Sequence, residues 1–207
     1  MNPQPPTNTS MQQKYFNDEF NDVPNLNLIP IDYKGIRIQP FIENSIRFSI
    51  NPGIAVKLSF LEKSLHSDTQ SILLSAFGIL LYRYSSQNDF VIGVPFEISK
   101  NKDIHVVDLP IRFIFHDEPS FGEILGAVKN KINTALEKSE AYGITQERTD
   151  TKKGRTKSTY PFRVLFEFIP KAAEKSNPEE TRDQVPEHRS FDLYLRIVEE
   201  NDLLDFK

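Results

Sequence analysis

The sequence has 207 residues, of which 38% are hydrophobic and 11% aromatic, enough apolar material for one globular domain or one lobe of a larger domain. Its net charge of −4 argues against nucleic acid as a partner, and the absence of cysteine excludes disulfides, thiol nucleophiles and thiolate metal sites. The N-terminus lacks a basic-then-apolar pattern and there is no long uninterrupted apolar span, so we expect a cytoplasmic protein that does not enter a membrane.

Residues 1–25 are predicted to be a disordered N-terminal tail, because residues 2–10 contain only Asn, Pro, Gln, Thr and Ser. Three aromatic side chains, Tyr15, Phe16 and Phe20, leave open a short docking segment within this stretch. The domain itself is expected over residues 26–207.

The first elements of the expected domain are a strand and a helix. Ser45–Ile50 alternates as a strand does, and Asn51–Gly53 interrupts it. Ile54–Leu65 then has helical spacing, with Val56, Phe60 and Leu61 on one side.

Residues 67–96 form the centre of the sequence. Ser67–Ser85 is the most apolar run and predicts a helix buried on most sides, with Ser67 and Gln70 as its capping box. Asp89–Pro95 follows as a short buried strand, and a helix leading into such a strand is typical of a layered α/β domain. We expect Arg83 and Asp89 to hold this fold together, and their opposite charges could form an ion pair.

A second strand and helix follow. The polar stretch Ile98–Val107 is predicted to be a loop, and Val107–His116 a strand with Arg112 on the face opposite its apolar residues. Ser120 and Glu123 form a capping box for a helix that we expect to reach a C-cap at Gly143.

The last third alternates strands with polar loops. Tyr160–Pro170 is predicted to be a strand with Phe162, Val164, Phe166 and Phe168 on one face. Phe191–Val198 is the next strand, and a turn leads from it into Leu203–Phe206.

These elements resemble the C-terminal lobe of a nonribosomal peptide synthetase condensation domain. The resemblance rests on Ala76-Phe77, Leu80-Leu81, Arg83-Tyr84-Ser85, Gln87, Asp89, Ile92–Pro95, Tyr160–Phe162 and Phe191–Leu193. It implies an α/β fold in which helices pack on a two-layer mixed sheet, one lobe of a chloramphenicol-acetyltransferase-like fold. We expect structural roles for the matching residues, which include Arg83, Tyr84, Asp89, Gly93, Pro95, Pro161, Phe162, Phe191 and Asp192.

The catalytic motif of that family is missing from this sequence. The family uses an HHxxxDG motif in its N-terminal lobe, where the second histidine positions or deprotonates the acceptor amine. The four histidines, His66, His105, His116 and His188, are never adjacent and none precedes xxxDG. The family's IGxFVNT and HQxxPF motifs are absent as well, so we predict no catalytic residue, no metal site and no activity of this chain alone.

The resemblance also implies partners, namely an adenylation domain, a peptidyl carrier protein, or both. No cofactor is expected on this chain itself, since phosphopantetheine would be carried by the partner carrier protein. Lys152, Lys153, Arg155 and Lys157 are candidate contacts with an acidic carrier helix or with the phosphopantetheine phosphate, although a solvated loop is the more common explanation of such a charge run.

Three functional hypotheses remain open at this point. The chain is a scaffold lobe beside adenylation or carrier domains, or half of an acyl-transfer enzyme completed by a separate histidine-bearing lobe, or a module that recruits a tailoring enzyme. The predicted strand that reaches Lys207 leads us to expect a domain truncated at its C-terminal strand, and hence a fragment of a longer protein.

Overall fold

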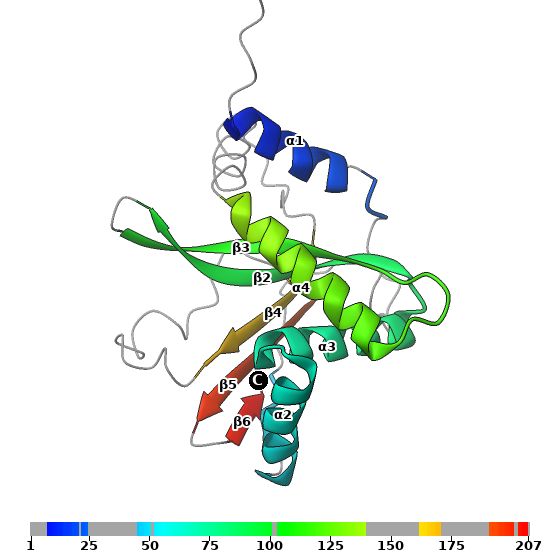
Figure 1. The fold of residues 1–207 in the computed structure, drawn as a ribbon, viewed down its shortest axis with the longest axis vertical. Coiled ribbons are helices and arrows are strands. Elements are labelled where there is room, and N and C mark those ends of the chain that lie inside the picture. Colours follow the sequence, from blue (N-terminus) through cyan, green and yellow to red (C-terminus); the bar gives the residue numbers. More distant parts are fainter. Residues whose placement is uncertain are drawn as a thin grey trace, which may run out of the picture.

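A six-stranded mixed sheet forms the centre of the structure, with the strand order β1-β6-β5-β4-β2-β3 (Figure 1). The structure is a computed structural model, and it describes residues 8–20, 22–24, 45–50, 52–100, 103–139, 162–170, 191–200 and 203–206. The elements in chain order are α1 (Asn8–Phe20), β1 (Phe48–Ser49), α2 (Pro52–Leu65), α3 (Thr69–Ser85), β2 (Asp89–Lys100), β3 (Asp103–Ile114), α4 (Phe121–Glu137), β4 (Val164–Ile169), β5 (Leu193–Glu200) and β6 (Leu203–Phe206).

Both parallel and antiparallel pairs occur in this sheet. β2 pairs with β3 antiparallel and with β4 parallel, and β4 pairs with β5 parallel. β6 joins β5 and β1 antiparallel at the other edge. The predicted α/β fold with a mixed sheet and packed helices is therefore confirmed.

The long ribbon formed by β2 and β3 corrects one prediction. Ile98–Val107 was expected to be a loop, yet Ile98 pairs with His105 and Ser99 pairs with Ile104. Backbone hydrogen bonds hold such a ribbon together, so the polar side chains near its end do not prevent pairing. Only residues 101–102 separate the two strands.

The first face of the sheet carries the main core beneath α3 and α4. Alternate residues of β2 and β3 point to this side, among them Phe90, Ile92 and Phe113, and they meet Leu74 and Val128 from the two helices. Gly78 of α3 allows close approach, because a Cβ there would lie 2.3 Å from the Phe113 ring. In Figure 1, α4 crosses in front of the β2–β3 ribbon.

Helix boundaries follow the caps, and one of them differs from the prediction. α3 begins at Thr69 with Asp68 as N-cap, because the Asp68 carboxylate accepts hydrogen bonds from the Ser71 N–H at 2.8 Å and the Ser71 hydroxyl at 2.7 Å. The predicted cap at Ser67 is therefore wrong by one residue. The capping box of Ser120 and Glu123 is confirmed for α4.

The strand and helix predicted before α3 also have shifted bounds. The strand expected over Ser45–Ile50 is reduced to the two residues of β1. α2 starts at Pro52, a residue suited to the first turn of a helix because its missing N–H needs no partner there. α4 ends at Glu137 with Lys138 as C-cap, and the expected cap Gly143 lies outside the described residues.

The prediction of a disordered tail is wrong for residues 8–20, because these residues form helix α1. Phe16 is 5% exposed and belongs to the main core, while Phe20 lies one helical turn later and stacks on it at 6.1 Å. The Lys138 ammonium lies 3.6 Å from the centre of the Tyr15 ring. These contacts agree with the docking segment that the aromatic residues left open, and Figure 1 places α1 beside the C-terminal end of α4.

Within the described ranges, no helix combines the length and the apolar character that a membrane span requires.

We predict that the docking of α1 stabilises the whole lobe. Phe16→Ala should lower the free energy of unfolding by about 3 kcal/mol, because it removes an aromatic ring from a closed core. The neighbouring exposed residue gives a matched control, Asn17→Ala, which should change the stability by less than about 0.5 kcal/mol. Urea denaturation followed by circular dichroism measures both, and equal stabilities of the two variants would contradict the docking of α1.

Candidate functional site

A second, smaller apolar cluster lies on the opposite face of the sheet. It consists of Val91, Phe162 and Leu165, with Phe20, Val23, Phe191 and Tyr194 packed around it. Val91 points away from the main core because successive side chains of a strand alternate between faces. The prediction that Phe162 shares a face with Val164 and Phe166 is wrong, since Phe162 precedes β4 and its ring joins this second cluster.

Three residues that carry the family resemblance meet in this cluster. Gly93 is buried, and a Cβ at its position would lie 2.1 Å from Cε2 of Phe162. Phe162 in turn stacks on Phe191 at 6.1 Å with ring planes 8° apart. Gly93 therefore leaves room for an aromatic pair that ties the start of β4 to the residues before β5.

An ion pair fastens the same two segments. Arg163 donates to both carboxylate oxygens of Asp192 at 2.5 Å, and the Asp192 N–H donates to the Arg163 carbonyl at 2.8 Å. The hydrogen bonds to Asp192 raise the pKa of the Arg163 guanidinium. Both side chains are more than one third exposed, so water screens this pair and it contributes little to stability.

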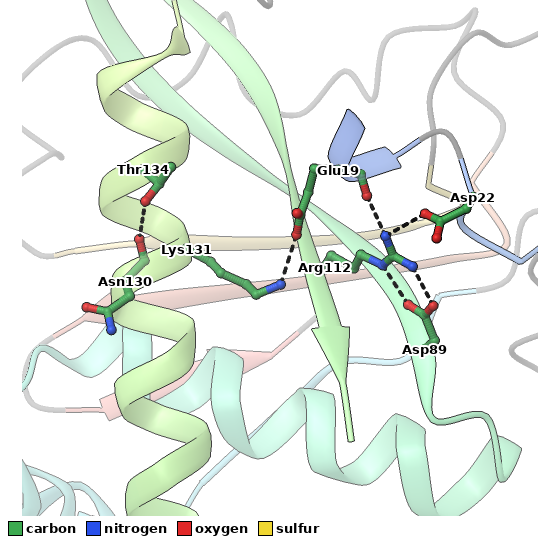
Figure 2. Close-up of polar contacts among 7 residues, drawn as sticks. All are labelled: Glu19, Asp22, Asp89, Arg112, Asn130, Lys131 and Thr134. Atoms are coloured by element: carbon green, nitrogen blue, oxygen red, sulfur yellow. Dashed lines mark hydrogen bonds and ion pairs between the residues drawn. The ribbon is translucent and has the colours of Figure 1, made fainter. Parts of the chain in front are cut away.

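Arg112 binds several acceptors at once, and Figure 2 shows its partners. It donates to the Asp89 carboxylate at 2.8 and 2.6 Å, to the Asp22 carboxylate at 2.8 Å, and to the Glu19 carbonyl at 2.5 Å. Arg112 is 8% exposed, and its hydrogen bonds to Asp89 raise the pKa of the guanidinium above the ordinary value. The hydrogen bond from Arg112 likewise holds the pKa of Asp22 below its ordinary value.

The arrangement around Arg112 corrects the expected pair of Arg83 and Asp89. Arg83 is exposed on α3, whereas Arg112 stands opposite Val91 in the β2–β3 register and thus lies on the same face as Asp89. A side chain on the adjacent strand reaches the carboxylate directly. Next to it, Lys131 of α4 binds the Glu19 carboxylate at 3.1 Å, which fastens the end of α1 a second time (Figure 2).

A polar group lies on the second face at β4 and β5. The Tyr194 hydroxyl donates to the Glu167 carboxylate, and Arg196 Nε lies 3.4 Å from Oε2 of Glu167. Burial is the main cause that raises the pKa of Tyr194, so its hydroxyl stays protonated and serves as a donor. Asp108 of β3 is 3% exposed on the same face and adds to this effect.

The other residues singled out from the sequence are not members of the second cluster or lie outside the described part. Tyr84 is 70% exposed, and Pro95 is half-buried in β2 opposite Asp108. His66 and His116 are exposed and far apart in the sequence. Residues outside the described ranges are Pro161, His188 and the basic candidates Lys152, Lys153, Arg155 and Lys157.

No group of three or more histidine, aspartate or glutamate side chains that could bind a metal occurs in the part of the chain that the structure describes. The sequence did not reveal Arg112 as the partner of Asp89, although an arginine between apolar neighbours of a strand is an available signal for a buried ion pair. What the geometry offers is a scaffold of packed rings and ion pairs.

The sequence model of the family described as "Condensation domain" matches residues 5–207. The chain belongs to the condensation-domain family. The match includes α1, in agreement with the packing of that helix on the lobe.

Curated relatives of this condensation-domain chain are peptide synthetases. It is 28% identical to gramicidin S synthase 2 of Brevibacillus brevis over 93% of its length, and 26% identical to bacitracin synthase 1 of Bacillus licheniformis over 75%. The chain spans only 5% and 3% of the length of these two proteins.

Solved structures show the same fold at low sequence identity. The condensation domain from the monacolin K polyketide synthase MokA has a TM-score of 0.67 at 20% identity, with 96% of this chain and 51% of that chain covered. The four-domain nonribosomal peptide synthetase AB3403, bound to AMP and glycine, has a TM-score of 0.75 at 16% identity. The match covers 98% of this chain and 17% of that chain. The predicted lobe of a chloramphenicol-acetyltransferase-like fold is thus confirmed.

The space left by Gly93 yields one prediction about the second face. Gly93→Ala should destabilise the lobe by about 1–3 kcal/mol, because the buried and stacked Phe162 ring cannot give way without moving Phe191. Gly126→Ala in α4 is the matched control, since no atom lies within 4 Å of its Cβ position and alanine favours helix. Urea denaturation should show opposite signs for the two variants, and an equally stable Gly93→Ala would refute the close contact.

A second prediction separates the buried ion pair from the exposed one. Arg112→Gln should lower the free energy of unfolding by about 3–5 kcal/mol, because the partly buried Asp89 carboxylate loses its partner. Arg163→Gln should cost less than about 1 kcal/mol, since its pair with Asp192 is exposed. Thermal and urea unfolding of both variants measure the difference, and similar losses would show that Arg112 has no special role.

Proposed function

We propose that this chain serves as a non-catalytic interaction lobe of a condensation domain within a peptide-synthesising assembly in the cytoplasm. The observation that carries the proposal is the combination of C-terminal-lobe motifs with the absence of HHxxxDG from all 207 residues. In this proposal the chain docks beside an adenylation domain, a carrier protein, or both.

The proposed lack of activity follows from the chemistry of amide formation. An acceptor amine on a carrier protein needs an imidazole of near-neutral pKa, held in place at the reacting centre. His66 and His116 are exposed, and neither is adjacent to another histidine in the sequence. The match to about half of the MokA condensation domain supports the proposal that one lobe alone is represented in this chain.

The phosphopantetheine group belongs, in this proposal, to a partner carrier protein. Its contacts on this chain would be the basic candidates Lys152, Lys153, Arg155 and Lys157, as expected from the sequence. The lobe would then contribute binding and orientation, and the partner the reactive thioester.

A second candidate function is half of an acyl-transfer enzyme that a separate histidine-bearing lobe completes. Its support is that Val106 and Ile114 of β3, two large apolar side chains, stay exposed in the described structure. Such a surface is what a lobe normally covered by another would present.

An amide-forming assay distinguishes the two candidates. The purified chain is mixed with carrier-bound donor and acceptor, with and without an isolated histidine-bearing lobe, and the product is measured by mass spectrometry. The proposal predicts no amide in either mixture, while a complete two-lobe condensation domain forms it as the positive control. Amide formation only when both lobes are present would replace the proposal with the second candidate.

The proposal also predicts that the chain binds a partner domain. The chain should capture the adenylation or carrier domain encoded beside it and should alter amino-acid activation or the solubility of that domain. If it captures neither, the proposed role as an interaction lobe is wrong.

A further inference from the structure

The outward side of α2 carries a concentration of exposed apolar side chains. Eleven large hydrophobic residues are exposed among those that the structure describes, and four of them lie on this one helix. Val56 and Phe60 are the most exposed of the four, at 71% and 70%, and Ile54 and Leu61 flank them at 53% and 39%. Single exposed apolar residues are ordinary, but a group on one helix marks an interaction site. We call this group the α2 patch.

The α2 patch is not required to hold α2 on the lobe, because the opposite side of the helix does so. Leu58 packs against the main core, and the Glu62 carboxylate accepts a hydrogen bond from the Thr69 hydroxyl of α3. Figure 1 shows α2 at the periphery, beside β6 and α3. Between α2 and the sheet remains a hollow of about 150 Å³ with a mixed lining, which includes Val56, Leu58 and Leu204 as well as Ser59, Thr69 and Glu199.

The charges on the outward side of α2 are positive. Lys57 and Lys63 are both exposed and lie three residues before and after Phe60, which places them roughly 60° to either side of it around the helix. The one acidic residue of the helix, Glu62, is turned toward Thr69. Phe60 is therefore an apolar centre between two ammonium groups, on a chain whose net charge is −4.

We propose that the α2 patch is the docking surface for the partner domain, and that the partner presents an apolar patch bordered by carboxylates. This inference rests on the proposed function and assigns a location and a chemistry to its partner. A fixed aromatic side chain at the centre of a contact is a typical source of binding energy, and flanking charges set the partner and the orientation.

The charges also argue against a second copy of this chain as the occupant. A two-fold axis through Phe60 in an antiparallel pair of α2 helices would place Lys63 of one copy against Lys57 of the other. Each end of such a contact would bring like charges together, and the pairing would be unfavourable. A surface with carboxylates satisfies both lysines instead.

The experiment measures the affinity of the full chain for the purified adenylation and carrier domains encoded beside it, by isothermal titration at low and high salt. Phe60→Ser should weaken binding about tenfold or more, and the double variant Lys57→Glu with Lys63→Glu should weaken it and reduce its salt dependence. Leu80→Ser on α3, which removes an apolar side chain of 59% exposure from another helix, is the control and should leave the affinity unchanged. Circular dichroism verifies that all variants keep the fold.

Each other outcome overturns the inference in a recognisable way. If the unaltered chain binds a domain and the α2 variants bind it equally well, the α2 patch is not the docking surface while the proposed function stands. If the unaltered chain binds neither domain, the proposed function fails and this assignment fails with it. Self-association that Phe60→Ser abolishes, or Phe60-dependent binding to vesicles of phosphatidylglycerol, would replace the partner domain with a second copy or a membrane surface.

Discussion

The buried guanidinium of Arg112 joins parts of the chain that lie about 90 residues apart. A charge removed from water is costly unless its donors are matched, and here two carboxylates and one carbonyl accept from it. Asp89 connects β2 to β3 through this group, while Asp22 and the Glu19 carbonyl bring in the end of α1. The position of α1 on the lobe depends on this arrangement together with the burial of Phe16.

The two faces of the sheet differ in character, and the difference explains the role of the family motifs. The first face packs apolar helices over stacked rings such as Phe90 on Phe113 at 5.5 Å. The second face mixes a small aromatic cluster with ion pairs and the Tyr194–Glu167 hydrogen bond. Within that second face Gly93 makes room for the stacked rings of Phe162 and Phe191, and Asp192 pairs with Arg163.

The sequence indicated most elements, because helical and alternating apolar spacing is strong from α3 to α4. It failed where long-range contacts decide the outcome. Residues 8–20 are polar on average. They form a helix because Phe16 packs into a core whose other residues are distant in the sequence. The end of the β2–β3 ribbon is polar and still pairs, since its backbone bonds do not depend on side chains. Asp89 was matched with the nearest arginine in sequence, whereas the strand register supplies Arg112.

Exposure could not be read from the spacing of α2 either. Apolar residues occupy several sides of this helix, and only the fold determines that Leu58 points inward while Phe60 stays outside. Amide formation needs a histidine at the reacting centre, whereas an interaction lobe needs an exposed binding surface. We therefore propose that this chain functions at its surface, at α2.

Hydrogen–deuterium exchange of the chain, alone and with its neighbouring adenylation or carrier domain, tests this central claim most directly. The account predicts slower exchange along α2 and at the adjoining edge of β6 in the complex, with α4 unchanged. Protection confined to the second sheet face around Gly93 and Tyr194, with α2 unchanged, would contradict it and would locate the function between the sheet and a missing lobe.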